Sequence, residues 1–202
     1  MKNRKYFYDY LVEMAAIAHI GLLYSRDPYA LENYQQIKER TEQMLKDFQE
    51  VDFAQNPLFP RPVYPTPNVS VRTVCFNPKG EVLLVREASD GGFSLPGGWC
   101  DLYDSPKETA ENEFLQETGA KVKITQLVGV LSRIPFQSPV EIPAYIIVFR
   151  GEIIKKVSQP VHEITEVGFF SPDYLPPLSP KITKEENLRM IHAAKNNEVI
   201  FD

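Results

Sequence analysis

Apolar residues recur at spacings of three and four along the first fifty positions, which is the period of one face of an α-helix. The first run covers residues 4–24, where Gly21 is expected to interrupt or end the helix. Asp27 and Pro28 then supply a helix cap and a first-turn proline, and a second run follows as far as Phe48. The pattern predicts a helical hairpin. Two such helices bury little core by themselves, so they need the downstream chain or a second copy, and we expect a homodimer through them.

Beyond residue 68 the pattern changes to short apolar and β-branched runs, which predict β-strands. We expect strands at residues 69–76, 81–86, 122–134, 144–154 and 166–170, and a last helix at about 183–196. Residues 77–80 predict a hairpin turn between the first two strands. Strands before and after a central helix, with a closing helix at the end, predict an α/β fold with a mixed sheet covered on both faces.

The segment NPLFPRPVYPTP, residues 56–67, contains five prolines and predicts an extended linker. It divides the chain into an N-terminal helical hairpin, residues 1–55, and a second domain, residues 68–202. A length of 202 residues suits one small segment followed by one domain of common size.

Composition and charge limit the class of protein. The formal net charge of -5 argues against binding nucleic acid non-specifically, so DNA binding is not expected. Cys75 and Cys100 lie far apart without a paired spacing, which indicates neither a disulfide scaffold nor a zinc cluster. No run of about eighteen apolar residues occurs, and the N-terminus lacks an apolar signal core. We therefore expect a cytoplasmic protein with no membrane span.

The densest candidate chemistry lies between Gly97 and Gly119, in GGWCDLYDSPKETAENEFLQETG. Ser105 and Glu108 have the spacing of a capping box around Pro106, and Gly119 supplies the stop. These signals predict a helix between the two glycine sites.

Within this predicted helix, Glu113 and Glu117 are four residues apart and project from one face, with Gln116 beside them. Two carboxylates at this spacing suit a hard divalent cation, although the same pair also fits an ordinary solvated helix face. The glycines of the preceding segment, residues 95–98, favour the cation because they let the backbone pass close to a bulky or anionic group.

The same segment resembles the box of the Nudix hydrolases, G-x5-E-x7-R-E-U-x-E-E-x-G-U, in which U is aliphatic. The positions that match are Gly98, Glu113, Phe114, Glu117, Gly119 and Ala120. Three positions depart from it: Asp104 stands at the first Glu, Asn112 at the Arg, and Gln116 at the first Glu of the E-E pair. The resemblance implies a Nudix-type α/β/α sandwich.

The resemblance also implies a Mg²⁺ cofactor, with Mn²⁺ as a substitute. Glu113 and Glu117 are the expected inner metal ligands, Gln116 a weaker or outer ligand, and the backbone of Gly97 or Gly98 a further contact. Glutamine keeps an oxygen ligand but removes one negative charge, so the number of metal ions stays open.

Two acids of the loop have other expected roles. The resemblance implies that Asp104 anchors the loop, and Asp101 is an extra acid that can reach a second cation through water.

The general base is open among Glu141, Glu163 and Glu166. Glu163 and Glu166 are preferred because they lie just before the last predicted strand, where related enzymes carry acidic residues. Glu141 also fits a solvated loop acid, and His162 fits an incidental loop histidine.

Arg86 follows an apolar strand and precedes a glycine-rich turn, which suits a bidentate grip on a phosphate. Arg72 and Arg133 are weaker candidates, because either can cap a strand end or pair with a surface acid. Trp99 can stack on a base or pack in a core or an interface.

A second resemblance covers the N-terminal helices. The stretch IAHIGLLYSRDPYALENYQQI is similar to the helical segment of a Nudix subgroup labelled ADP-ribose pyrophosphatases, one branch of which resembles a CDP-choline pyrophosphatase. It implies Mg²⁺-dependent hydrolysis of a nucleoside diphosphate linked to another moiety, to a nucleoside monophosphate and a phosphorylated group. The altered box leaves an alternative, a nucleotide-binding or sensing module without turnover.

Overall fold

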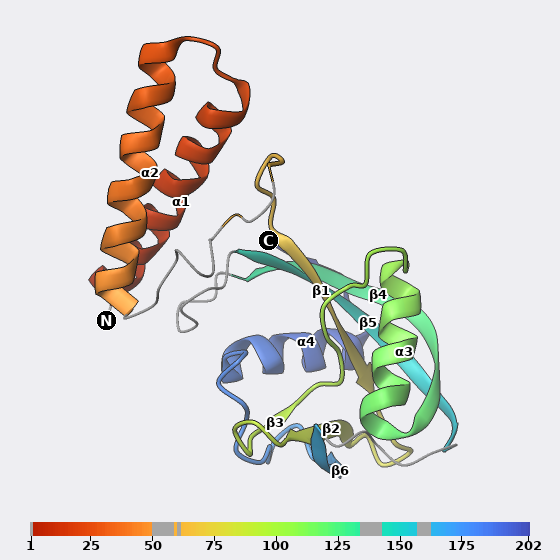
Figure 1. Cartoon of the computed structure of the whole chain (residues 1–202). Coiled ribbons are helices and arrows are strands. Elements are labelled where there is room, and N and C mark those ends of the chain that lie inside the picture. The colour runs from red at the N-terminus through yellow and green to blue at the C-terminus, as the bar shows by residue number, and fades with distance from the viewer. Residues whose placement is uncertain (1, 50–58, 60–61, 134–142, 157–162) are drawn as a thin grey trace. The chain divides into compact units, whose positions relative to one another are not determined.

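The computed structural model describes residues 2–49, 59, 62–133, 143–156 and 163–202 (Figure 1). Two compact units make up these residues. The first reaches Asn68, and the second covers Val69–Arg133 and Tyr145–Asp202. None of the helices in the described chain has the length together with the apolar character that crossing a bilayer needs.

The N-terminal unit is built from two helices, α1 (Lys2–Tyr24) and α2 (Pro28–Gln49), which pack against each other. The helix α1 continues through Gly21, so the expectation that this glycine interrupts or ends it is wrong. A Cβ at Gly21 would lie 2.4 Å from the ring of Tyr34 on α2. The glycine therefore serves close packing of the two helices rather than termination.

The predicted start of α2 is confirmed. The Oδ1 of Asp27 accepts a hydrogen bond from the backbone N–H of Tyr29 at 3.0 Å, which caps the helix. The helices bury their own small cluster of side chains, Tyr8, Leu11, Val12, Ala15 and Leu45.

Part of the predicted linker contacts α1. Residues 56–58, 60 and 61 lie outside the described residues. Phe59 packs against the buried cluster of the helices, and its ring lies 5.6 Å from that of His19. The Nε2 of His19 is 3.1 Å from the carbonyl oxygen of Val63. These contacts tie the described part of the linker to the helices.

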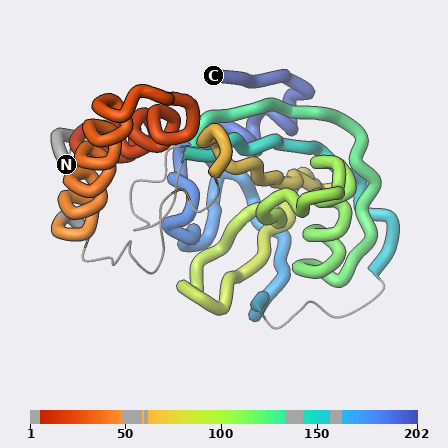
Figure 2. Tube along the Cα trace, turned by 45° about the horizontal axis from the view of Figure 1, so that its top comes forward, coloured from red at the N-terminus to blue at the C-terminus, as the bar shows by residue number. Residues whose placement is uncertain are grey.

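The second unit contains two sheets and two helices. Its elements are β1 (Asn68–Cys75), β2 (Val82–Glu87), β3 (Phe93–Ser94), α3 (Pro106–Thr118), β4 (Ala120–Arg133), β5 (Ala144–Lys156), β6 (Ile164–Phe170), α4 (Lys184–Asn196) and β7 (Ile200–Phe201). The strand orders are β1-β5-β4-β7 and β3-β2-β6. The strand β7 runs parallel to β4, whereas β2 is antiparallel to both its neighbours. In Figure 2 the C-terminal end of the chain is the dark blue segment.

The predicted turn at residues 77–80 forms, but the strands that it joins enter different sheets. The N–H of Gly80 donates to the carbonyl of Asn77 at 2.9 Å, and Gly80 has a φ of 80°. After an antiparallel bridge between Phe76 and Val82, β1 continues in one sheet and β2 in the other. The turn expected from the sequence is therefore present, but β1 and β2 do not continue as a paired hairpin beyond it.

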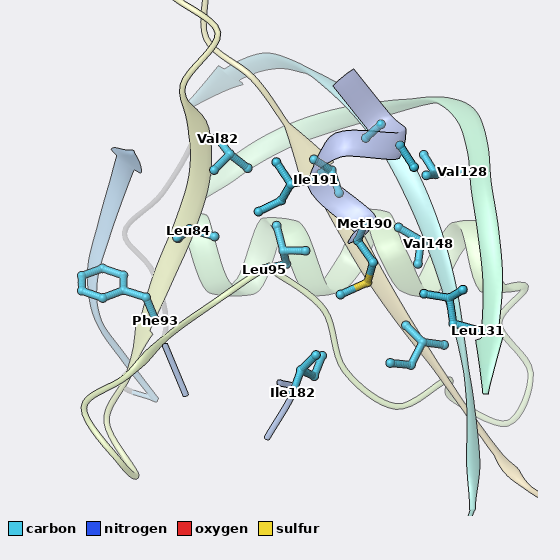
Figure 3. Packing of buried hydrophobic residues seen from close by; sticks show 14 residues of the cluster. Val82, Leu84, Phe93, Leu95, Val128, Leu131, Val148, Ile182, Met190 and Ile191 are labelled. Carbon is cyan, nitrogen blue, oxygen red and sulfur yellow. The ribbon is translucent and has the colours of Figure 1, made fainter. Parts of the chain in front are cut away.

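Side chains that alternate along β2 face opposite layers. Leu84 belongs to a buried cluster with Met190 of α4, as Figure 3 shows, whereas Val85 belongs to a cluster with Phe114 of α3. A strand with helices on both faces is buried on both sides. The α/β/α arrangement expected from the sequence is confirmed.

Candidate active site

The helix α3 is bounded as its sequence predicts. The Ser105 hydroxyl oxygen accepts from the N–H of Glu108 at 3.3 Å, and the Glu108 carboxylate accepts from the N–H of Ser105 at 2.9 Å. The Ser105 hydroxyl also donates to the Glu108 carboxylate at 2.7 Å, and this hydrogen bond, together with that from the Ser105 N–H, holds the pKa of Glu108 below its usual range. At the other end Gly119 adopts a left-handed conformation with φ 69°. The two caps fix where the carboxylates of α3 stand.

The segment before α3 extends along β1 like an additional strand. The N–H of Val71 donates to the carbonyl of Gly98 at 2.9 Å, and that of Thr73 donates to Pro96 at 2.8 Å. The alternating pattern of such pairing leaves the polar groups of Gly97 turned away from β1. Its N–H donates to Oε2 of Glu117 at 2.8 Å. A loop atom is thereby bonded to a carboxylate of α3.

Both glycines of the loop are required by close contacts. Gly97 has a φ of 145°, and a Cβ there would lie 2.1 Å from the carbonyl oxygen of Val71. At Gly98 a Cβ would lie 2.4 Å from Oε1 of Glu113. The loop therefore passes directly against the Glu113 carboxylate, and a larger residue at either position would displace the loop or the group that it contacts.

The two carboxylates of α3 lie in a setting that disfavours their negative charge. Burial raises the pKa of Glu117 to about 7, with Arg72 and the N–H of Gly97 opposing the shift and Glu113 adding to it. Burial also raises the pKa of Glu113, and the negative charges of Asp101 and Glu163 raise it further. A cation bound between these acids would relieve their desolvation and repulsion.

This donor set fits a hard divalent cation. Mg²⁺ is held through one or two carboxylates and completes its shell with water and substrate phosphates, so Glu113 and Glu117 suffice as protein ligands. Nowhere in the described residues do three or more His, Cys, Asp or Glu side chains gather as a ready-made metal cluster.

Comparison with known families agrees with this geometry. Residues 66–193 match the model of the NUDIX domain. The chain belongs to the Nudix family. Residues 5–55 match a second model, described as "UDP-X-like, N-terminal oligomerisation domain". The chain is accordingly a Nudix hydrolase, a pyrophosphohydrolase that acts on phosphoanhydrides.

Individual Nudix relatives resemble most of the chain. A Bacillus subtilis (strain 168) protein named "Putative ADP-ribose pyrophosphatase YjhB" is 33% identical over 179 residues, which cover 87% of this chain and 86% of that protein. The crystal structure of a UDP-X diphosphatase is 29% identical, covers 95% of both chains and has a TM-score of 0.61. That of an ADP-ribose pyrophosphatase from Streptococcus suis 89-1591 is 31% identical, covers 68% of this chain and all of its own, and has a TM-score of 0.58.

Two of the three departures from the Nudix box contact each other. The Nδ2 of Asn112 donates to Oδ2 of Asp104 at 3.0 Å, so the loop acid is bonded to α3. Gln116 is exposed on the same helix. The geometry gives Asp104 a contact suited to anchoring the loop, and leaves Gln116 at the surface.

The candidate bases separate in the structure. The negative charge of Glu163 contributes to raising the pKa of Glu113, and its backbone carbonyl accepts a hydrogen bond from the N–H of Ala88 at 2.8 Å, just after β2. Glu166 instead lies opposite Arg86 on neighbouring strands, with Oε2 3.6 Å from Nη1 of the arginine. Glu141 and His162 lie outside the described residues.

The predicted substrate contacts have different surroundings. The Nε of Arg86 donates to the carbonyl of Gly91 at 2.9 Å, and its guanidinium lies 5.8 Å from the centre of the Phe93 ring. Trp99 forms an antiparallel bridge with Ser70 and is 44% exposed. Both side chains therefore have surface that a substrate can reach.

A hydrogen-bonded group around Glu87, with Ser94 and Lys181, was not predicted from the sequence. Glu87 is buried and accepts hydrogen bonds from Ser94 and from Nζ of Lys181, each at 2.8 Å. Arg133 donates to the carbonyl of Lys181 at 2.6 Å. Glu87 also acts on the pKa of Arg72, which had been a minor candidate. Arg72 is predicted from the sequence only as a weaker phosphate contact, although a charged residue among the apolar residues of β1 is a signal that could have drawn attention to it.

Proposed function

We propose that this Nudix chain hydrolyses the diphosphate of a nucleoside diphosphate linked to another moiety, releasing a nucleoside monophosphate and the phosphorylated moiety. The observation that carries the proposal is the pair of desolvated carboxylates, Glu113 and Glu117, held against Gly97 and Gly98. ADP-ribose and UDP-linked compounds are the leading substrates, because the relatives with the broadest coverage carry those names. CDP-choline, which the sequence also suggested, belongs in the same test.

The metal-binding residues are Glu113, Glu117 and the backbone of Gly97, with Gln116 as an outer ligand. Mg²⁺ or Mn²⁺, when bound, would neutralise diphosphate oxygens and acidify a water molecule. The carboxylates would hold the ion beside the loop, whose two glycines let its backbone pass directly against Val71 and Glu113. The departure at position 116 lowers the negative charge available to the ion.

Glu163 is the proposed general base, since its negative charge is one of those that raise the pKa of Glu113. Its carboxylate takes a proton from water as the water oxygen bonds to one phosphorus atom. The bond from that phosphorus to the bridging oxygen breaks, and the bridging oxygen leaves with the other phosphate. Glu166, the second candidate, is instead proposed as the ion-pair partner of Arg86. When substrate binds, the guanidinium of Arg86 would leave Glu166 and bind a substrate phosphate.

Trp99 is proposed to stack on the nucleobase or the linked group. Its ring is partly exposed beside the segment that includes Gly97 and Gly98. An indole face is suited to an aromatic base, whose identity the side chain alone does not select.

The N-terminal helices, residues 1–55, are proposed to form a homodimer ahead of the linker at 56–67 and the catalytic domain at 68–202. They match a model described as an oligomerisation domain. Their exposed large apolar side chains are Tyr6, Phe7, Tyr10, Ile17, Tyr24, Tyr29, Ile37 and Met44. Burial of such side chains against a second copy would favour association. The free thiols of Cys75 and Cys100 support the cytoplasm as the proposed location.

A substrate panel tests the proposed reaction. The full chain is incubated with Mg²⁺ and, separately, ADP-ribose, UDP-glucose, CDP-choline and a dinucleoside diphosphate, and the products are separated by ion-exchange chromatography. We expect a nucleoside monophosphate from at least one compound. Binding of these compounds without any turnover would instead support the alternative, a sensing module, to which Gln116 and Asn112 point.

A further inference from the structure

Arg72 is a buried cation in the middle of β1. It is 7% exposed, and its Nη1 donates to the carbonyl oxygen of Gly97. The N–H of the same glycine donates to Oε2 of Glu117 at 2.8 Å. Both polar backbone atoms of Gly97 are therefore held by side chains: the carbonyl by Arg72 of β1, and the N–H by Glu117 of α3.

Gly97 needs such holding because glycine is the most flexible residue of the backbone. Its φ of 145° is one that few other residues adopt, and its neighbours Pro96 and Gly98 are paired with β1. The polar backbone atoms of Gly97 itself point away from β1, so its carbonyl is bonded by the side chain of Arg72 and not by the backbone of that strand.

Burial of this arginine is not explained by structural stability alone. Its Nε is buried and, among the described residues, has no hydrogen-bond partner. Burying an incompletely bonded cation costs free energy. Burial lowers the pKa of Arg72, and the charges of Glu117, Glu87 and Glu113 oppose that shift. The largest of these opposing charges is that of Glu117 on α3.

We propose that Arg72 is a positioning residue for the metal site, which fixes Gly97 and through it orients the carboxylate of Glu117. The inference rests on the metal-dependent function proposed above. It assigns Arg72 no contact with substrate.

A role of Arg72 in orienting Glu117 and a role through its charge alone predict opposite changes in metal affinity when Arg72 is removed. If the arginine acted through its charge alone, its removal would leave the carboxylates more negative and strengthen the binding of a divalent cation. If it positions Glu117, its removal weakens binding, because a ligand that is no longer held in place loses affinity for the ion.

The test measures Mn²⁺ binding to the full chain by calorimetry without nucleotide, together with kcat and KM for the substrate hydrolysed best. For Arg72→Gln we expect the Mn²⁺ Kd to rise about 10- to 100-fold. We also expect kcat to fall while KM changes little. Arg72→Lys, which keeps the charge but loses the fork of donors, should lie between this variant and the unmodified chain. The control is Arg189→Gln, which removes an arginine paired with Asp202 at 2.6 Å and should bind Mn²⁺ normally.

Unchanged or tighter Mn²⁺ binding by Arg72→Gln would overturn the inference. If that variant does not fold, as judged by its thermal melt, Arg72→Lys decides, and binding equal to that of the unmodified chain overturns the inference. In a Glu117→Gln background, Arg72→Gln should weaken binding no further, because the arginine acts through Glu117. Failure of the unmodified chain to bind Mn²⁺ or hydrolyse any compound would count against the proposed function instead.

Discussion

Asn112 donates a hydrogen bond to Asp104, with Nδ2 and Oδ2 3.0 Å apart. The box pattern has an arginine and a glutamate at these two positions. The chain thus replaces a guanidinium and a longer carboxylate by an amide and a shorter carboxylate, and it keeps a donor facing an acceptor. The departures at positions 104 and 112 are therefore coupled. The loop stays hydrogen-bonded to α3, but the donor is a neutral amide in place of a charged guanidinium.

This coupling predicts a non-additive double-mutant cycle. Asp104→Ala and Asn112→Ala should each lower kcat/KM about 2- to 5-fold, since an exposed hydrogen bond contributes about 0.5–1 kcal/mol. The double variant should lose little more than either single one. The check is steady-state kinetics with thermal melts of all four proteins. Additive losses would show that the two residues act separately.

The two candidate bases predict different kinetic changes. Glu163→Gln should lower kcat by about 10²-fold or more, because general-base catalysis contributes that much. Glu166→Gln should act mainly on KM, since it changes the partner of Arg86. A larger loss of kcat from Glu166→Gln than from Glu163→Gln would reverse the assignment.

Gly98 predicts a steric effect on the metal site. Gly98→Ala should displace the Glu113 carboxylate, whose Oε1 would lie 2.4 Å from the new Cβ, and so weaken Mn²⁺ binding and turnover. The matched control is Gly80→Ala, whose Cβ meets no atom within 4 Å. That control should lose about 1–2 kcal/mol of stability from its left-handed conformation, with little change in metal affinity. Equal metal affinity in both variants would contradict the contact.

The exposed face of α1 predicts a change of assembly. Ile17 is 44% exposed, so Ile17→Asp should leave each copy folded while placing a charge in the proposed interface. Light scattering coupled to gel filtration should give a dimer for the unmodified chain and a monomer for the variant. The matched control is Glu13→Asp, an exposed acid on the same helix, which should stay dimeric. A dimeric Ile17→Asp variant would exclude this face as the main interface.

The parts of the fold that the sequence predicts are those set by nearby residues. The limits of α3 follow from Ser105, Glu108 and Gly119, each within a few residues of the end that it fixes. The split of β1 and β2 into two sheets depends on pairing with distant strands. The strands β3 and β7 contain two residues each, too few to show an alternating pattern.

The site divides in the same way. Spacing along α3 puts Glu113 and Glu117 on one face, which the sequence predicts. The bond from Gly97 to Glu117 joins residues twenty positions apart, and that from Arg72 to Gly97 joins a strand residue to a loop residue twenty-five positions away. A lone arginine in a strand carries no sign of which distant atom it will hold. The link between β1 and the carboxylates could therefore be found only in the folded chain.

The most direct test of the proposed function is turnover of ADP-ribose and UDP-glucose, followed by ³¹P nuclear magnetic resonance, by the unmodified chain and by Glu117→Gln. Glu185→Gln, a change of an exposed acid on α4, serves as the control. We predict Mg²⁺-dependent cleavage by the unmodified chain and the control, abolished by a chelator. We also predict a kcat at least about 10²-fold lower for Glu117→Gln, equivalent to about 2.7 kcal/mol. Full activity of Glu117→Gln, or turnover that persists with the chelator, would contradict a metal-dependent mechanism at these carboxylates.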